Sequence, residues 1–96
     1  MENSAPRVTI RYCTLCNWML RAAWLGQELL STFGPEIGEV ALIPDTTGGV
    51  FVVAVDDRVI WDRKIEERFP EAKEIKQRLR DMIDPSRDLG HADRHG

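Results

Sequence analysis

The sequence has no long hydrophobic run and no excess of positive charge. None of its apolar stretches approaches the roughly 20 residues that a membrane-spanning helix needs, although 43% of the 96 residues are hydrophobic. Thirteen basic residues against sixteen acidic ones give a formal net charge of −3, whereas a nucleic-acid-binding surface normally leaves a basic footprint. We therefore expect neither a membrane nor a nucleic acid among the partners.

The start of the chain also lacks the features of an export signal. Residues 1–6 contain no basic residue and no apolar stretch, so we expect a cytoplasmic protein. Only two cysteines are present, Cys13 and Cys16, and a structural disulfide would not persist in a reducing compartment. The pair is therefore expected to be catalytic or metal-binding.

Hydrophobic periodicity predicts six elements in one domain, residues 1–96, with residues 1–6 and about 86–96 as flexible tails. Alternating apolar and polar residues predict a strand over residues 7–12, and a helix follows over about 16–32. Apolar runs predict strands over residues 40–43 and 50–55, the first covered on both faces. A turn leads to a fourth strand over 59–61, residues 62–69 form a charged connection, and the last helix begins near Pro70 and ends at Asp84-Pro85.

This order predicts an α+β, two-layer, thioredoxin-like fold: strand-helix-strand-strand-strand-helix. A four-stranded mixed sheet is expected, with the first two strands parallel and both helices mainly on one face. Sites gather at the carboxyl ends of parallel strands, so the cysteines, the loop around Gly48 and Gly49, and the pair Arg63-Lys64 should share one edge. An uncovered apolar sheet face favours a homo-oligomer.

The cysteine spacing at a strand–helix junction is typical of thiol–disulfide chemistry. The expected helix start places Cys13 at the cap and Cys16 in the first turn, where the helix dipole favours a thiolate by roughly 0.3–1 kcal/mol. Arg63 or Lys64 would add positive charge. One thiolate attacks a partner, and the other cysteine resolves the mixed disulfide.

Residues around the pair are expected to bind the substrate or to activate the thiols. Trp18 either packs in the core or shapes a peptide-binding surface, and adjacent glycines let a backbone approach a ligand closely. The predicted set is Thr14, Leu15, Trp18, Thr47, Gly48, Gly49, Phe51, Arg63 and Lys64. Trp24, on the polar helix face, is either a partner contact or is covered by Arg21 or by the C-terminal tail. A cis peptide bond at Pro44, like the cis-proline that faces the disulfide in thioredoxins, is a separate possibility.

Two other interpretations of the cysteines stay open. The pair could be buried and inert, or it could form a zinc site completed by His91 and His95, whose spacing is allowed. The histidines lie in a polar tail without a finger-like hairpin, so no metal is expected.

Three segments resemble the selenoprotein W-like branch of the SelT/SelW/SelH family, in its bacterial cysteine-containing form. They are Cys13-Thr14-Leu15-Cys16, Thr47-Gly48-Gly49-Val50-Phe51 and Ile60-Trp61-Asp62-Arg63-Lys64. The resemblance covers about residues 7–90 and implies a thioredoxin-like fold, a redox role and a link to glutathione as a co-substrate, with no bound cofactor. Selenium-containing members carry selenium at the position of Cys16.

These observations predict a thiol–disulfide redox protein, linked to glutathione or thioredoxin. Its partners would be protein thiols or disulfides, and turnover would make it a thiol–disulfide oxidoreductase. The alternative is a redox-sensitive adaptor that binds a protein without turnover.

Overall fold

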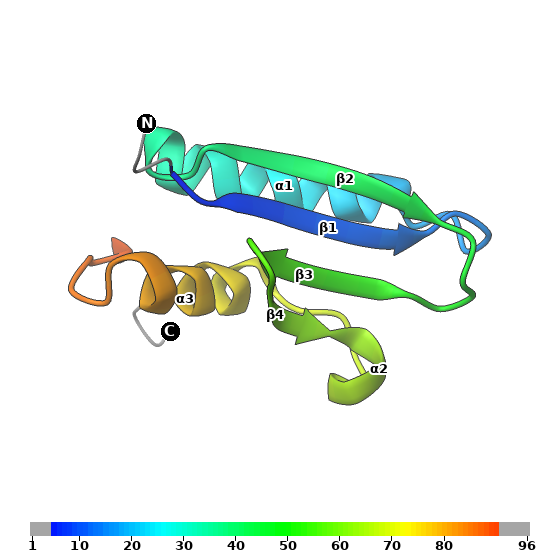
Figure 1. The fold of residues 1–96 in the computed structure, drawn as a ribbon. Helices are drawn as coiled ribbons and strands as arrows, with labels where there is room; N and C mark the ends of the chain where they lie inside the picture. The colour runs from blue at the N-terminus through cyan, green and yellow to red at the C-terminus, as the bar shows by residue number, and fades with distance from the viewer. Residues whose placement is uncertain (1–4, 91–96) are drawn as a thin grey trace.

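Four strands form one mixed sheet in the order β2-β1-β3-β4 (Figure 1). This computed structural model describes residues 5–90. Strand β1 (Arg7–Cys13) pairs in parallel with β2 (Glu39–Asp45) and antiparallel with β3 (Phe51–Val55). Strand β3 continues through a tight turn into antiparallel β4 (Arg58–Asp62). The predicted element order, the parallel first pair and the closing hairpin are confirmed.

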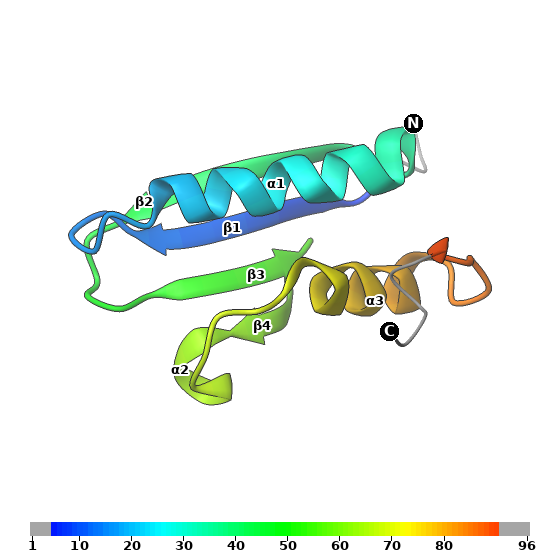
Figure 2. The same cartoon turned by 180° about the vertical axis from the view of Figure 1, so that it is seen from behind.

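Two long helices, α1 (Met19–Phe33) and α3 (Ala72–Ile83), lie on one face of this sheet (Figure 2). Gly26 lets α1 approach β2, because a Cβ atom at this position would lie 3.2 Å from Cγ1 of Val40. A 3₁₀ turn, η1 (Gly34–Glu36), follows α1. Among residues 5–90, no helix has the length and hydrophobicity needed to cross a membrane.

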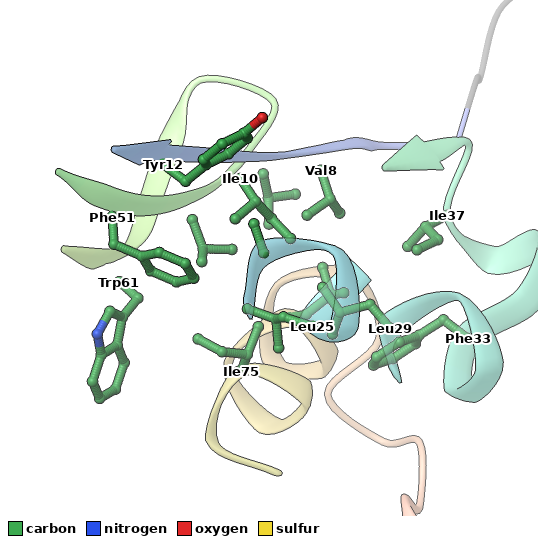
Figure 3. Close-up of a cluster of buried hydrophobic side chains, with 14 of the residues drawn as sticks. Val8, Ile10, Tyr12, Leu25, Leu29, Phe33, Ile37, Phe51, Trp61 and Ile75 are labelled. Atoms are coloured by element: carbon green, nitrogen blue, oxygen red, sulfur yellow. The ribbon is translucent and has the colours of Figure 1, made fainter. Parts of the chain in front are cut away.

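The buried core lies between the sheet and the two long helices. Leu25 and Leu29 of α1 and Ile75 of α3 point toward one another beside Ile10 of β1 (Figure 3). Full burial of one such side chain is worth about 1.5–3 kcal/mol, and these four are at most 2% exposed. This packing fixes α1 against the sheet and thereby the loop that precedes the helix.

The prediction that the second strand is covered on both faces is wrong. Leu42 is 37% exposed and Val40, Ala41 and Ile43 are only half-buried, because β2 is an edge strand with α1 over one face. An uninterrupted apolar run therefore does not distinguish an edge strand from a central one. The expected homo-oligomer stays a prediction, which sedimentation at high protein concentration would test.

The charged connection before the last helix contains one helical turn, α2 (Arg63–Glu66). The carboxylate of Asp62 caps it by accepting a hydrogen bond of 3.0 Å from the backbone N–H of Lys64. Such an aspartate at an N-cap satisfies a backbone donor that has no partner within the helix. The turn fixes where the basic pair of α2 emerges after β4.

Arg87 and Leu89 pack against the rest of the fold, whereas a flexible tail was expected from about residue 86. The guanidinium of Arg87 donates a 3.0 Å hydrogen bond to the carbonyl of Thr32 and pairs with Glu36 at 3.0 Å. It also lies over the ring of Phe33, and Leu89 is buried in the core. One arginine and one leucine thus anchor a mostly polar segment to the end of α1. Residues 1–4 and 91–96 lie outside the described part of the chain.

Candidate redox site

Cys13 ends β1, and Cys16 lies in the turn that follows it. The backbone N–H of Cys13 donates to the carbonyl of Val50 at 2.9 Å, and the N–H of Asn17 closes the turn on the carbonyl of Thr14 at 3.3 Å. The two cysteines lie close together. Cys13 is fully buried at 0% exposure, whereas Cys16 is only half-buried. A partner molecule therefore has access to Cys16 before Cys13.

Helix α1 begins at Met19, later than predicted. Asn17 has a φ of 60°, a left-handed conformation that asparagine adopts more readily than most residues. This conformation keeps the chain out of the helix until Trp18, the N-cap. The prediction that Cys13 caps the helix and Cys16 lies in its first turn is wrong. Since the dipole effect is confined to the first turn, it supports a thiolate less than the sequence suggested.

Asp45, the last residue of β2, holds the loops of this edge together. Its carbonyl accepts hydrogen bonds from the N–H and the hydroxyl of Thr14, at 2.9 and 3.2 Å. Its carboxylate accepts one from the N–H of Thr47 at 2.8 Å and pairs with Arg11 at 3.2 Å. The hydrogen bonds from Thr47, with a smaller contribution from Arg11, lower the pKa of Asp45 below its ordinary value.

The sequence reasoning missed Asp45. The sequence did contain a signal for it, the pattern of an Asx turn, in which the side chain of a loop aspartate accepts a hydrogen bond from the backbone N–H two residues later. The segment Asp45-Thr46-Thr47 has this pattern. Its consequence for the cysteine loop, however, depends on the register of β1 against β2, in which Cys13 faces Asp45.

The glycine loop and the basic pair lie side by side, as the strand directions required. Gly49 has a φ of +79°, and a Cβ atom there would lie 3.6 Å from Cε of Lys64 and 4.0 Å from Nη1 of Arg63. Thr47 and Gly48 are exposed beside them. Figure 1 shows this loop next to the cysteine loop at the right-hand end of the sheet. The structure thus brings together the three segments named from sequence.

An aromatic cluster of Trp18, Phe51 and Phe69 follows the cysteine turn and packs around its last residues. Trp18 and Phe69 meet edge to face with ring centroids 4.7 Å apart, and Phe51 lies 5.2 Å from Phe69. The guanidinium of Arg63 lies over Trp18 at 4.9 Å, and that of Arg21 lies over Phe69 at 3.9 Å. Trp18 and Phe51 therefore serve in packing. The cluster also carries two cations at this edge, one over Trp18 and one over Phe69.

Two further side chains of the predicted set face solvent, and so does Trp24, which was considered separately. Leu15 is 73% exposed within the cysteine turn, and Thr14 beside it is exposed. Trp24 stays 49% exposed, and Arg21 lies over Phe69 rather than over this ring. No described peptide bond is cis, so the alternative of a cis bond at Pro44 is wrong.

Metal binding was the other chemistry open to a cysteine pair. Within residues 5–90, no group of three or more histidine, cysteine, aspartate or glutamate side chains could hold a metal ion. His91 and His95, the residues of the zinc alternative, lie outside the described residues.

Comparison with known proteins agrees with this geometry. A family model described as the Rdx family matches residues 7–81, and no curated protein matches the chain. A crystal structure from Bordetella parapertussis is 57% identical, covers 82% of this chain and 99% of its own, and superposes with a TM-score of 0.80. That of a selenoprotein W-related protein from Vibrio cholerae is also 57% identical, with 84% and 100% covered and a TM-score of 0.81.

The resemblance drawn from the three sequence segments is thereby confirmed, together with the thioredoxin-like fold. The matched residues 7–81 include the cysteine turn, the glycine loop and the basic pair. The chain therefore belongs to the Rdx family and is similar to selenoprotein W-related proteins.

Proposed function

We propose that this chain is a thiol–disulfide redox protein in which Cys16 attacks and Cys13 resolves. The observation that carries the proposal is the unequal exposure of two neighbouring cysteines, with Cys13 at 0% and Cys16 half-buried. An attacking thiolate needs access to a partner sulfur, whereas a resolving thiol needs access only to its neighbour. Membership of a redox-associated family supports the redox role of the chain.

The reaction proceeds in two displacements. The Cys16 thiolate attacks one sulfur of a partner disulfide, forms a mixed disulfide and releases the other partner sulfur as a thiolate, which takes a proton. Cys13 then loses its proton and attacks the sulfur of Cys16. The first partner sulfur leaves as a thiol, and an intramolecular disulfide remains. Two electrons pass from the cysteine pair to the partner, and an external thiol reductant restores the pair.

The surroundings of the pair suit these steps. Hydrogen bonds to Val50 and Asp45 fix the chain on both sides of Cys13, so the resolving sulfur is positioned without a large motion. The cations of Arg63 and Lys64 emerge beside the glycine loop and favour a thiolate at this edge. We propose glutathione or thioredoxin as the reductant, protein thiols or disulfides as partners, and the cytoplasm as the compartment.

A second candidate is a redox-sensitive adaptor that binds a protein without turnover. The exposed Leu15 and Trp24 beside the cysteine turn favour it, because exposed large apolar side chains frequently mark contact surfaces. Turnover distinguishes the two candidates: an adaptor forms the intramolecular disulfide once, whereas an oxidoreductase consumes reductant continuously.

Trapping of the mixed disulfide tests the proposed roles directly. Mild oxidation of the reduced protein should lower its mass by two hydrogens. With a disulfide-linked peptide, Cys13→Ser should accumulate a stable adduct on Cys16, since the resolving thiol is gone. Cys16→Ser is the matched control and should react far more slowly through the buried Cys13. Two thiols that stay alkylatable after oxidation, or equal trapping by both variants, would overturn the proposal.

A further inference from the structure

We infer that the surface beside Cys16 is a docking groove for an acidic segment of a protein partner that also carries a large apolar residue. The groove is lined by Asn17, Trp18, Leu20, Arg21 and Trp24. The inference rests on the proposed function, because it names the partner that the reactive cysteine meets.

The first observation is a set of cations without acidic partners. Most other arginines of the described chain are paired with carboxylates, as Arg11 is with Asp45 and Arg78 with Glu66. Within residues 5–90, the side chains of Arg21 and Arg63 form no salt bridge, and Nε of Arg63 is buried without a hydrogen-bond partner. A chain with a net charge of −3 therefore keeps two guanidinium groups free beside its reactive cysteine.

The second observation is how these two cations are held. Phe69 carries both, with the guanidinium of Arg21 at 3.9 Å and that of Arg63 at 5.1 Å from its ring centroid. Stacking fixes a guanidinium group, and its N–H donors lie in the plane of the group and not toward the ring. Because Nε of Arg63 is buried, this arginine offers a ligand only the donors of its Nη atoms. Such a pre-positioned fork is the geometry that binds a carboxylate through two parallel hydrogen bonds.

The third observation is apolar surface next to the cations. Leu20 is 75% exposed, and Trp24 follows it one helical turn later at 49% exposure. Leu15, next to Cys16, is 73% exposed. Exposed aromatic and aliphatic side chains that flank a groove provide the anchors of protein contacts. Charge complementarity with Arg21 and Arg63 then selects an acidic partner over a basic one.

The length of the groove favours a polypeptide over a small anion. A single carboxylate would need only the two guanidinium groups. The exposed apolar surface continues from Leu20 to Trp24, about 6 Å further along the helix axis, which suits a second side chain of the same segment. The groove therefore fits a chain that places acidic residues on Arg21 and Arg63 and an apolar residue against Trp24.

Two peptide disulfides that differ only in charge test this inference. One carries glutamates beside its cysteine and a leucine beyond them, and the other carries glutamines in place of the glutamates. At low salt the wild type should react with the acidic peptide about tenfold faster, the scale of a charge contact of ~1.4 kcal/mol. Arg21→Gln should reduce this ratio to about two or less. Arg58→Gln, which removes an equal charge at the start of β4, should leave the ratio unchanged.

The anchor residue and the proposed function are tested by the same peptides. Trp24→Ala should slow the reaction with both peptides and leave their ratio intact. The inference would be overturned if the wild type reacted equally fast with the acidic and the neutral peptide, or if Arg21→Gln left the ratio of the two rates unchanged. It would also be overturned if the reaction depended on Arg21 only with oxidised glutathione as the substrate. If even a neutral small disulfide fails to react, the proposed function has failed. Binding of a fluorescent acidic peptide with serine for cysteine then decides the inference alone, since Arg21→Gln must weaken it.

Discussion

A single carbonyl oxygen of Asp45 accepts two hydrogen bonds from Thr14, one from its backbone N–H at 2.9 Å and one from its hydroxyl at 3.2 Å. The end of β2 thus holds the first residue after the buried cysteine. Because Thr47 in turn donates to the Asp45 carboxylate, one residue couples the cysteine turn to the glycine loop. The position of the cysteine turn is therefore linked to that of the glycine loop through Asp45.

Loss of the Asp45 carboxylate should loosen the glycine loop first. In Asp45→Ala the backbone N–H of Thr47 loses its acceptor, so its amide hydrogen should exchange with solvent about fivefold faster, as expected for the loss of a net ~1 kcal/mol hydrogen bond. Asp45→Asn keeps an acceptor oxygen and should change the rate much less. Hydrogen exchange followed by NMR measures both. Equal rates in the wild type and Asp45→Ala would show that the carboxylate does not hold this loop.

The basic pair should favour the thiolate of Cys16. Removing positive charge disfavours an anion, so Arg63→Ala combined with Lys64→Ala should raise the pKa of Cys16, and only slightly, since exposed charges interact weakly. High salt should reduce the difference. The pH dependence of alkylation measures it in a Cys13→Ser background, with Arg58→Ala and Lys73→Ala together as the control. If the titration curve of Cys16 were the same with and without the two basic residues, neither would have a role in activating the thiol.

The arrangement of the site followed from element order, whereas its local geometry did not. Strand direction alone placed Cys13, Gly49 and Arg63 at one edge, because the carboxyl ends of β1, β2 and β4 all lie there. The start of α1 was missed because the left-handed φ of Asn17 depends on how the turn closes onto Thr14. A pattern of apolar residues contains no information about such a turn.

Long-range contacts explain the other differences. Leu89 and Arg87 are isolated in a polar segment, and only the folded chain shows that they meet the end of α1. Phe69 lies in a stretch of charged residues, and its contacts with Arg21 and Arg63 depend on the path of the chain after α2. The groove beside Cys16 could therefore not be predicted from sequence, although Trp24 was singled out on the polar helix face.

The ion pair between the two long helices, in which the lysine is buried and the glutamate is not, should show an asymmetric response to substitution. The ammonium of Lys76, whose side chain is 8% exposed, lies 2.9 Å from the carboxylate of Glu28. Glu28→Ala leaves this charge buried without its partner and should cost about 1–3 kcal/mol of unfolding free energy. Lys76→Met removes the charge together with its desolvation and should cost less than about 1 kcal/mol.

Urea unfolding of the two single variants and the double variant measures this asymmetry. In the Lys76→Met background, Glu28→Ala should change the unfolding free energy little further, because the lysine charge that it would leave unpaired is already gone. Equal costs for both single substitutions, or additive costs in the double variant, would contradict a desolvation origin and assign the effect to packing.

Glu74 should make the stability of the fold depend on acid pH. The hydrogen bonds from Arg68 lower its pKa from 4.5 to about 2, with a further contribution from the backbone N–H of Glu71. The pKa in the folded state is below that in the unfolded state, so the stabilisation is fully present above about pH 4.5 and is lost as the pH falls toward 2. Arg68 is half exposed, so we expect only about 1 kcal/mol after solvent screening.

The comparison of Glu74→Gln with the wild type isolates this contribution. The variant should be less stable than the wild type by about 1 kcal/mol at pH 7. This difference in unfolding free energy should shrink steadily between pH 4.5 and pH 2, because the wild-type carboxylate becomes protonated there. Urea unfolding at several pH values measures it. Glu67→Gln, at an exposed carboxylate that ends α2, is the control and should show no such convergence. A difference for Glu74→Gln that stays constant down to pH 2 would mean that the charge of Glu74 contributes nothing beyond the hydrogen bonds that a neutral amide also accepts.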